Sequence, residues 1–322
     1  MISISIIIPA WNEGKVLEAT IEALLDVEYD KKRCEIIVVA GGEDNTYEIA
    51  RELTIRMEIF SRYVVILQGP QGKNVAIQQG IKEAANDTIV LLDADTIVSR
   101  QWLKCMVDPI QQGNCDLTIA NPEPVVKNWV SDYYMITKTY FLEGITTFSG
   151  HSIAFKSRDV KNLLEYFFDK EVRVGVDYLL AKRFLEHGKR IKFVKDAAVI
   201  THIPSSFKYF VLTELRWLTA LIHLDGVSYR TLACNSAVTA SLILTIPLSK
   251  TLFILALLFN VIYMTKRIHM FLIASRNYRT KLRNIFGFIM LSYAYQIIGF
   301  ISYIGYFWGF TKKSYLSQGE RY

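Results

Sequence analysis

Residues 88–96 read Thr-Ile-Val-Leu-Leu-Asp-Ala-Asp-Thr, and this stretch predicts a buried strand of an α/β sheet. The apolar run at 89–92 has the length and the β-branched content of a fully buried strand. It delivers Asp93 and Asp95 at its carboxyl end, where open α/β sheets bind their ligands. Two carboxylates so close together favour a divalent cation between them, and Mg²⁺ or Mn²⁺ prefers such oxygen ligands. The alternative is a solvated turn at the end of a strand.

Strands and helices alternate through the chain before this stretch. Apolar runs at 2–8, 35–40 and 63–67 predict three more strands, and the segment after each of them has helical spacing. Strands about 30 residues apart with helices between them are typical of a doubly wound, mainly parallel sheet. Such sheets bind nucleotides at their carboxyl edge. We therefore expect an α/β nucleotide-binding domain over residues 1–225.

Composition and charge narrow the classes of protein. The chain is 51% hydrophobic, too apolar for a wholly soluble protein, and the excess lies beyond residue 231. A net charge of +6 suits an anionic membrane surface or a phosphorylated substrate. No basic run interleaved with aromatic residues occurs in the first 200 residues, which argues against nucleic acid as a partner. The four cysteines have no metal spacing, so we expect them reduced and buried, and residues 2–8 are too short for a signal peptide.

Four motifs carry a family resemblance. The chain reads SIIIPAWNEGK at 5–15, EIIVVAGGEDNTYEIA at 35–50, GKNVAIQQGI at 72–81 and LLDADT at 91–96. In this order and at this spacing they resemble the nucleotide loop, acidic turn, helix start and metal motif of glycosyltransferase family 2. The resemblance covers roughly residues 3 to 220. It implies the GT-A fold, an inverting reaction and a nucleotide-sugar donor.

The resemblance assigns a nucleotide pocket residue by residue. It implies that Pro9, Ala10, Trp11 and Glu13 line the pocket of the base and the ribose. It also implies a nucleotide-binding role for three further residues, Asp44 in the acidic turn, Lys73 at the helix start and Asp93. The family usually has an aspartate where Ala40 stands, so the carboxylate that holds the uracil or ribose stays open. The alternative for Lys73 is a solvated lysine at a helix start.

Three further positions match the chemistry of transfer. Gly150 and His151 lie in a glycine-rich segment that resembles the part of the family that shapes the diphosphate and acceptor pocket. A single histidine is more often structural than catalytic. Asp177 matches the catalytic acidic residue, although Val176 replaces the family's usual glutamate. The resemblance implies that Asp177 is the general base, and the alternative is an ordinary helix cap.

The end of the expected domain matches membrane-bound members of the family. His202 matches a further metal or diphosphate ligand of related enzymes. Arg216 and Trp217 resemble the Q-x-x-R-W signature, with Thr213 in place of glutamine. Arg216 would bind the leaving diphosphate through two hydrogen bonds. The alternative is that this arginine and tryptophan anchor an amphipathic helix at a lipid surface.

The remainder of the chain predicts an all-α transmembrane region at 226–322. Segments 232–248, 251–264 and 285–310 contain no charged residue, and we expect three or four transmembrane helices with a hairpin at 247–250. Six basic residues at 266–283 place that segment in the cytoplasm, on the side of the catalytic domain. The aromatic-rich segment 129–142 suits either core packing or a membrane-facing helix, and we favour the second.

The expected activity follows from the resemblance. The protein would be an integral membrane enzyme with a cytoplasmic catalytic domain, using Mn²⁺ or Mg²⁺ held by Asp93, Asp95 and His202. It would move a sugar from a UDP-linked donor to a lipid-linked or glycan acceptor, with membrane lipids as further partners. One alternative is transfer to a polyprenyl phosphate, which needs no strong base. The other is a catalytically inactive membrane-bound scaffold or binding subunit.

Overall fold

The computed structural model describes residues 2–135, 150–169, 172, 175–224, 241, 249–258, 260–262, 265 and 285–307. The chain divides into two units. The first consists of Met1–Val125 and Ile145–His202, and the second of Val126–Gly144 and Ile203–Tyr322. The division therefore falls after residue 202 instead of the expected 225, and segment 126–144 joins the second unit.

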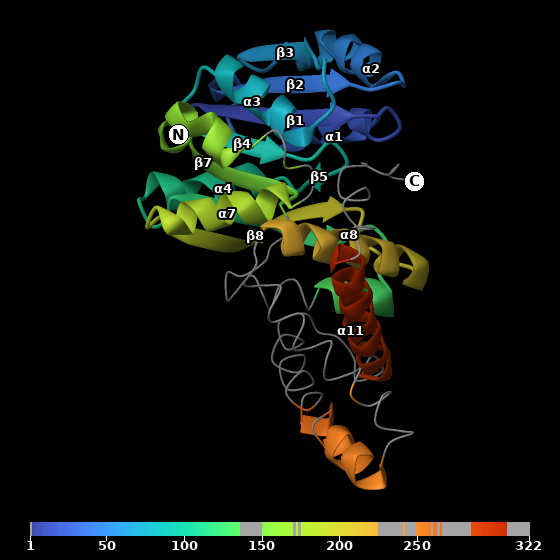
Figure 1. Ribbon diagram of the computed structural model, residues 1–322. Coiled ribbons are helices and arrows are strands. Elements are labelled where there is room, and N and C mark those ends of the chain that lie inside the picture. The colour runs from blue at the N-terminus through green and yellow to red at the C-terminus, as the bar shows by residue number, and fades with distance from the viewer. Residues whose placement is uncertain are drawn as a thin grey trace. The chain divides into compact units, whose positions relative to one another are not determined.

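An eight-stranded sheet forms the centre of the first unit (Figure 1). Its strands are β1 (Ile4–Trp11), β2 (Cys34–Gly41), β3 (Arg62–Leu67), β4 (Thr88–Leu92), β5 (Ile97–Val98), β6 (Leu117–Pro124), β7 (Ser152–Lys156) and β8 (Ile191–Thr201). Their order is β3-β2-β1-β4-β7-β6-β8-β5. The predicted strands at 2–8, 35–40, 63–67 and 88–92 all lie in this sheet.

The sheet is mixed: four of its seven strand pairings are parallel, among them that of β6 with β8, and three are antiparallel. Strands β1 to β4 pair in parallel, as the alternation of strands and helices predicts. Strand β7 runs antiparallel to both β4 and β6, and β5 runs antiparallel to β8. The connection from β6 to β7 includes segment 126–144, which belongs to the second unit.

Helices cover both faces of the sheet. They are α1 (Leu17–Ala23), α2 (Thr46–Glu52), α3 (Lys73–Glu83), α4 (Trp102–Gln111), α6 (Leu164–Phe167) and α7 (Val176–Glu186). Short 3-10 turns span Leu24–Asp26, Lys31–Arg33, Ile55–Met57, Ser157–Asp159 and Lys161–Leu163. Ile4, Ile6 and Ile8 of β1 pack in one core cluster with α1, α2 and α4. A Cβ on Gly80 would lie 2.4 Å from Ile7, so α3 lies directly on the opposite face.

The second unit contains helices α8 (Phe207–Leu224) and α11 (Ile285–Phe307). Tyr133 and Tyr134 are buried in one cluster with residues of both helices, and the Tyr133 ring meets Phe210 edge-on at 5.5 Å. A Cβ on Gly287 would lie 2.7 Å from the Trp129 ring. Of the described part of the aromatic segment, Tyr133 and Tyr134 therefore pack in a core, in place of the membrane-facing position that we favoured, whereas Trp129 is 37% exposed.

The described residues do not support the predicted transmembrane region. Among the helices that the structure describes, none combines the length and the apolar character that crossing a membrane takes. The predicted span at 232–248 lies outside the described residues except for Ser241, and the basic segment 266–283 lies outside them entirely. The span at 251–264 is described in part, and the span at 285–310 up to residue 307.

Candidate active site

Sheet register brings Asp93 next to His151. Strands β4 and β7 are antiparallel, with Leu92 opposite Ser152. The ladder continues one step further, because the Asp93 N–H donates to the His151 carbonyl at 2.9 Å. Residues opposite each other on antiparallel strands have neighbouring side chains. The Thr20 hydroxyl donates to the carbonyl of Ala94 at 2.7 Å and fixes the turn that follows β4.

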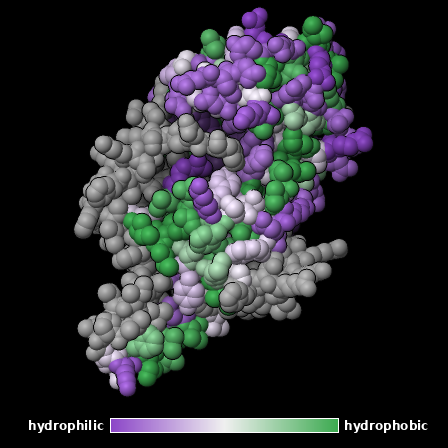
Figure 2. Space-filling view, turned by 90° about the vertical axis from the view of Figure 1, so that its right-hand side faces the viewer, coloured by the Kyte–Doolittle hydropathy of each residue, from purple (hydrophilic) through white to green (hydrophobic). Residues whose placement is uncertain are grey.

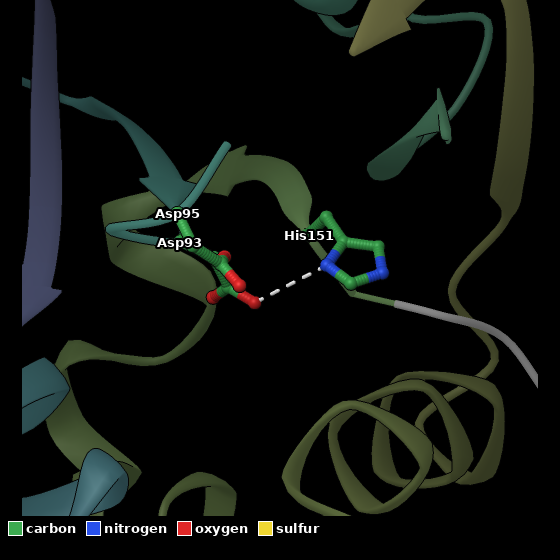
Figure 3. Close-up of side chains that lie close together, drawn as sticks. All are labelled: Asp93, Asp95 and His151. Carbon is green, nitrogen blue, oxygen red and sulfur yellow. Dashed lines mark ion pairs between the residues drawn. The ribbon is translucent and has the colours of Figure 1, made fainter. Parts of the chain in front are cut away.

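Asp93, Asp95 and His151 form a compact group of possible metal ligands. One ligand atom from each lies within 4.8 Å of the others. Figure 3 shows the imidazole of His151 facing the two carboxylates, and its Nδ1 lies 3.5 Å from Asp93 Oδ2. Carboxylate oxygens and one imidazole nitrogen are suitable ligands for a divalent cation. These residues therefore fit the cation that the sequence predicts.

Lys73 and Asp177 meet Asp93 on its other side. The Lys73 ammonium at the start of α3 lies 2.7 Å from Asp93 Oδ1 and 3.6 Å from Asp177 Oδ1. The lysine is 23% exposed, so it lies in the site and is not a fully solvated side chain. The Gly150 N–H donates to Asp177 Oδ2 at 3.2 Å. Both partners of the Asp177 carboxylate thus come from outside its own helix α7, which does not favour the role of an ordinary helix cap.

Asp93 is held in its charged form. Burial by itself would raise the pKa of this carboxyl, but the Lys73 ammonium and the hydrogen bond and charge of His151 outweigh it, so the pKa lies below the usual range. An ionised carboxylate with a second oxygen facing His151 is the form that a cation needs. The electrostatics therefore favour ligand binding at Asp93.

Asp44 connects the two loops at the carboxyl ends of β1 and β2. Its carboxylate accepts hydrogen bonds from Gly14 N at 3.0 Å, Thr46 N at 3.1 Å and Thr46 Oγ1 at 2.5 Å. Thr46 Oγ1 also accepts from the N–H of Glu13 at 2.8 Å. These bonds use much of the acceptor capacity of Asp44 within the protein. In the described structure this residue therefore positions the loop; its contact with a nucleotide stays a prediction.

The predicted base pocket lies at the end of β1. Pro9 is opposite Val39 in the parallel register, and Ala10 is buried. The ring of Trp11 packs over Gly41, where a Cβ would lie 2.9 Å from the ring. These residues lie at the carboxyl end of β1, as the sequence predicts. Their contact with a base stays a prediction.

Asn12 is a loop residue to which the sequence analysis assigned no role. It has a positive φ of 58°, and its side-chain oxygen accepts from the N–H of Glu43 at 2.7 Å. Its own N–H donates to Gly41 at 3.1 Å. Asparagine tolerates this left-handed conformation better than most residues, and its place directly after a strand was the available signal.

Two amides on α3 were also missed. Asn74 Nδ2 donates to the carbonyls of Asp169 at 2.6 Å and Val172 at 3.3 Å, and Gln78 Nε2 donates to Phe168 at 2.6 Å. Both amides are buried, and together they fix the segment that precedes α7. Two amides four residues apart share one face of a helix, and this spacing was the signal in the sequence.

Three further residues were predicted for the site. His202 follows the last residue of β8, is exposed, and is not among the three clustered ligands of the described residues. Arg216 and Trp217 lie on α8 in the second unit. Their contact with the diphosphate or the acceptor therefore stays a prediction.

Comparison with known proteins identifies the family. The model of Glycosyl transferase family 2 matches residues 5–165, half of the chain, and that of Glycosyl transferase family group 2 matches residues 88–311. Poly-beta-1,6-N-acetyl-D-glucosamine synthase of Staphylococcus aureus is 26% identical over 66% of this chain and 53% of that protein. Glycosyltransferase AglE of Haloferax volcanii is 31% identical over 37% of this chain and 39% of that protein. The chain spans about half the length of the first of these curated relatives.

Solved structures share the fold. Mannosyltransferase PcManGT from Pyrobaculum calidifontis, in complex with GDP-Man and Mn²⁺, has a TM-score of 0.61 at 16% identity, covering 94% of this chain and 86% of that one. TarS 1-349 of S. aureus in complex with UDP has a TM-score of 0.50 at 19% identity, covering 70% and 67%. The first unit is therefore a GT-A-like α/β domain with a mixed sheet. The two family models show that the chain belongs to glycosyl transferase family 2.

Proposed function

We propose that this glycosyltransferase moves a sugar, with inversion, from a UDP-linked donor to a lipid-linked or glycan acceptor at the cytoplasmic face of a membrane. The observation that carries the proposal is the meeting of Lys73, Asp93, His151 and Asp177 at one edge of the sheet. This edge presents a cation-binding group on one side and the Asp177 carboxylate on the other. Both are what a displacement at an anomeric carbon requires.

Each residue has a role in that displacement. Asp177 would take the proton of the acceptor hydroxyl as that oxygen attacks. Gly150 N–H and Lys73 hold the Asp177 carboxylate in place. Lys73 would also donate to a phosphate oxygen of the donor, since its ammonium already lies in the site. A divalent cation bound by Asp93 and Asp95 would supply positive charge to the leaving diphosphate.

The choice of a UDP-linked donor rests on the relatives. The S. aureus relative is named for a polymer of N-acetylglucosamine, and TarS was solved with UDP. PcManGT was solved with GDP-Man, so a guanosine-linked donor is the competing choice. Measuring transfer from a UDP-sugar and from a GDP-sugar side by side distinguishes the two choices of donor.

The choice of a membrane-associated acceptor rests on exposed apolar side chains in the second unit. The described helical residues within 250–262 carry seven of them, at Leu252, Ile254, Leu255, Leu257, Leu258, Val261 and Ile262. Figure 2 colours such hydrophobic surface green. Exposed apolar surface of this density is typical of contact with lipid or protein. Binding of the enzyme to a membrane would raise the effective concentration of an acceptor in the same membrane.

A second candidate is transfer to a polyprenyl phosphate. The observation that favours it is the ammonium of Lys73 within 3.6 Å of Asp177, because a cation beside the acceptor position suits a phosphate. A phosphate oxygen is already ionised and needs no base. An inactive scaffold is less favoured, because it would not need Asp93 and Asp177 to share one lysine.

The test uses full-length purified protein in lipid. Radiolabelled UDP- and GDP-sugars are supplied with membrane lipids, with and without Mn²⁺, and the product is analysed. The proposal expects transfer from a UDP-sugar into a lipid or glycan fraction only with the cation, and a product of inverted configuration. Label transferred equally well to a water-soluble sugar would contradict the acceptor assignment. No transfer from any donor would favour the scaffold.

A further inference from the structure

We propose that Asn74 and Gln78 of α3 are positioning residues for Asp177, and that they set its place from the helix that also carries Lys73. The inference rests on the proposed function, in which Asp177 is the base. It goes beyond that function because it names two residues that act on transfer through the backbone of α7. Among the described residues, no hydrogen bond or ion pair joins either amide to Asp177 itself.

Helix α7 begins without a side-chain cap. Its N-cap is Gly175, which has a left-handed φ of 77° and no side chain that could accept from the first N–H groups. Asp177 lies in the first turn of this helix. Its contact with Lys73 is 3.6 Å long, and a lysine is a flexible point charge that does not fix a backbone. The position of the Asp177 carboxylate therefore depends on the backbone that precedes α7.

Two amides of α3 hold that backbone. Asn74 Nδ2 donates to the carbonyls of Asp169 at 2.6 Å and Val172 at 3.3 Å. Gln78 Nε2 donates to the carbonyl of Phe168 at 2.6 Å. Both amides are buried, and so are Phe168 and Val172. Because buried carbonyls need hydrogen-bond donors, these three bonds fix the approach to α7 on α3.

The other end of the Asn74 amide shows which of its groups the protein uses. Asn74 Oδ1 is buried and has no hydrogen-bond partner among the described residues. The opposite end faces two carbonyls, which only accept, so that end is the NH₂ group. A buried oxygen without a partner is unfavourable, and an apolar side chain of the same size would avoid it. The asparagine therefore serves to hold the two carbonyls and not merely to fill space.

The first two turns of α3 carry the lysine and both amides. Lys73 and Asn74 are consecutive, and Gln78 follows Asn74 by four residues, on the same face of the helix. Lys73 also lies 2.7 Å from Asp93 Oδ1, at the place proposed for the donor. One helix thus holds the donor side of the site and the backbone that leads to Asp177. A misplacement of about 1 Å in a catalytic group can cost about 10²-fold in rate.

The experiment removes each donor group from the full chain and keeps the volume of the side chain. Gln78→Met and Asn74→Leu should each lower turnover by about tenfold or more. The Kd for UDP should change by less than about twofold, because the contact of Lys73 with Asp93 remains. Gln79→Met is the matched control and should keep wild-type turnover. Gln79 is the next residue of α3, and among the described residues it makes no hydrogen bond to the backbone before α7.

A double-mutant comparison separates positioning from a loss of stability. If Gln78 acts through Asp177, Gln78→Met lowers the turnover of the wild type but adds little to the loss in Asp177→Asn. An equal fold-loss in both backgrounds overturns the inference and leaves the proposed function standing. Near-normal turnover in Asp177→Asn alone removes the proposed base, and the inference with it.

A milder variant keeps the test decisive where the apolar replacements do not fold. Asn74→Ser retains a shorter donor, so it should show a smaller loss of turnover that also disappears in the Asp177→Asn background. Circular dichroism confirms that the proteins compared are equally folded. Wild-type turnover in a folded Asn74→Ser variant shows that the reach of the amide does not position Asp177, and overturns the inference.

Discussion

The contact between Gly150 and Asp177 allows a sharp test of the proposed base. A Cβ added to Gly150 would lie 2.2 Å from Asp177 Cγ, whereas ordinary contact begins at 3.4 Å. The carboxylate therefore has to move by about 1.2 Å, the difference between these two distances. A misplacement of about 1 Å in a catalytic group can cost about 10²-fold in rate. Gly150→Ala should lower turnover by that order and change donor affinity little.

Two measurements separate this effect from general damage. Overpacking can cost about 1–3 kcal/mol of stability, so the unfolding free energy of Gly150→Ala is measured beside its kinetics. Gly69→Ala is the matched control, because a Cβ there meets nothing within 4 Å, and it should keep wild-type turnover. If Gly150→Ala turns over as fast as Gly69→Ala, the close contact does not position a base and the reasoning is wrong.

Three further predictions follow from single residues. Asp177→Asn keeps the shape but cannot accept a proton, so turnover should fall by about 10²-fold or more with donor affinity unchanged; near-normal turnover would favour a phosphate acceptor. Burial would raise the pKa of Asp44, but hydrogen bonds from Thr46 and Gly14 outweigh it and lower the pKa. The stability from Asp44 should thus be present above about pH 4 and lost as pH falls through the folded-state pKa. Asp44→Ala should therefore cost about 1 kcal/mol at pH 7 and less near pH 3, measured by denaturant unfolding. Burial raises the pKa of the Cys34 thiol to about 12, so iodoacetamide at pH 8 should modify Cys34 only after unfolding, as read by mass spectrometry.

The strands of the first half could be predicted from the sequence because their signals are local. Four apolar runs separated by helical segments define β1 to β4 and their parallel pairing. The Asp93 and Asp95 pair could be placed at a sheet edge for the same reason, since it directly follows β4. The sequence assigned Lys73 and Asp93 to the same nucleotide site, whereas the contact between them is a finding of the structure.

Other features depend on pairing between distant strands, which one sequence does not encode locally. The direction of β7, which reverses relative to β4, decides that His151 meets Asp93. The pairing of β5 with β8 decides that Thr201, whose hydroxyl lies 3.3 Å from His151 Nδ1, and not His202 faces the site. The hydrogen bonds that occupy Asp44 are likewise invisible until the β1 and β2 loops lie side by side.

The central claim, that a cation held by Asp93 and Asp95 binds the donor diphosphate, is tested most directly by calorimetry of UDP with the full chain. The account predicts UDP binding that needs Mn²⁺ and that is lost both in excess chelator and in Asp95→Ala, while the fold of this variant is retained by circular dichroism. Equal UDP affinity and full transfer in excess chelator would contradict the account, and Lys73 and other basic residues would then neutralise the leaving diphosphate alone.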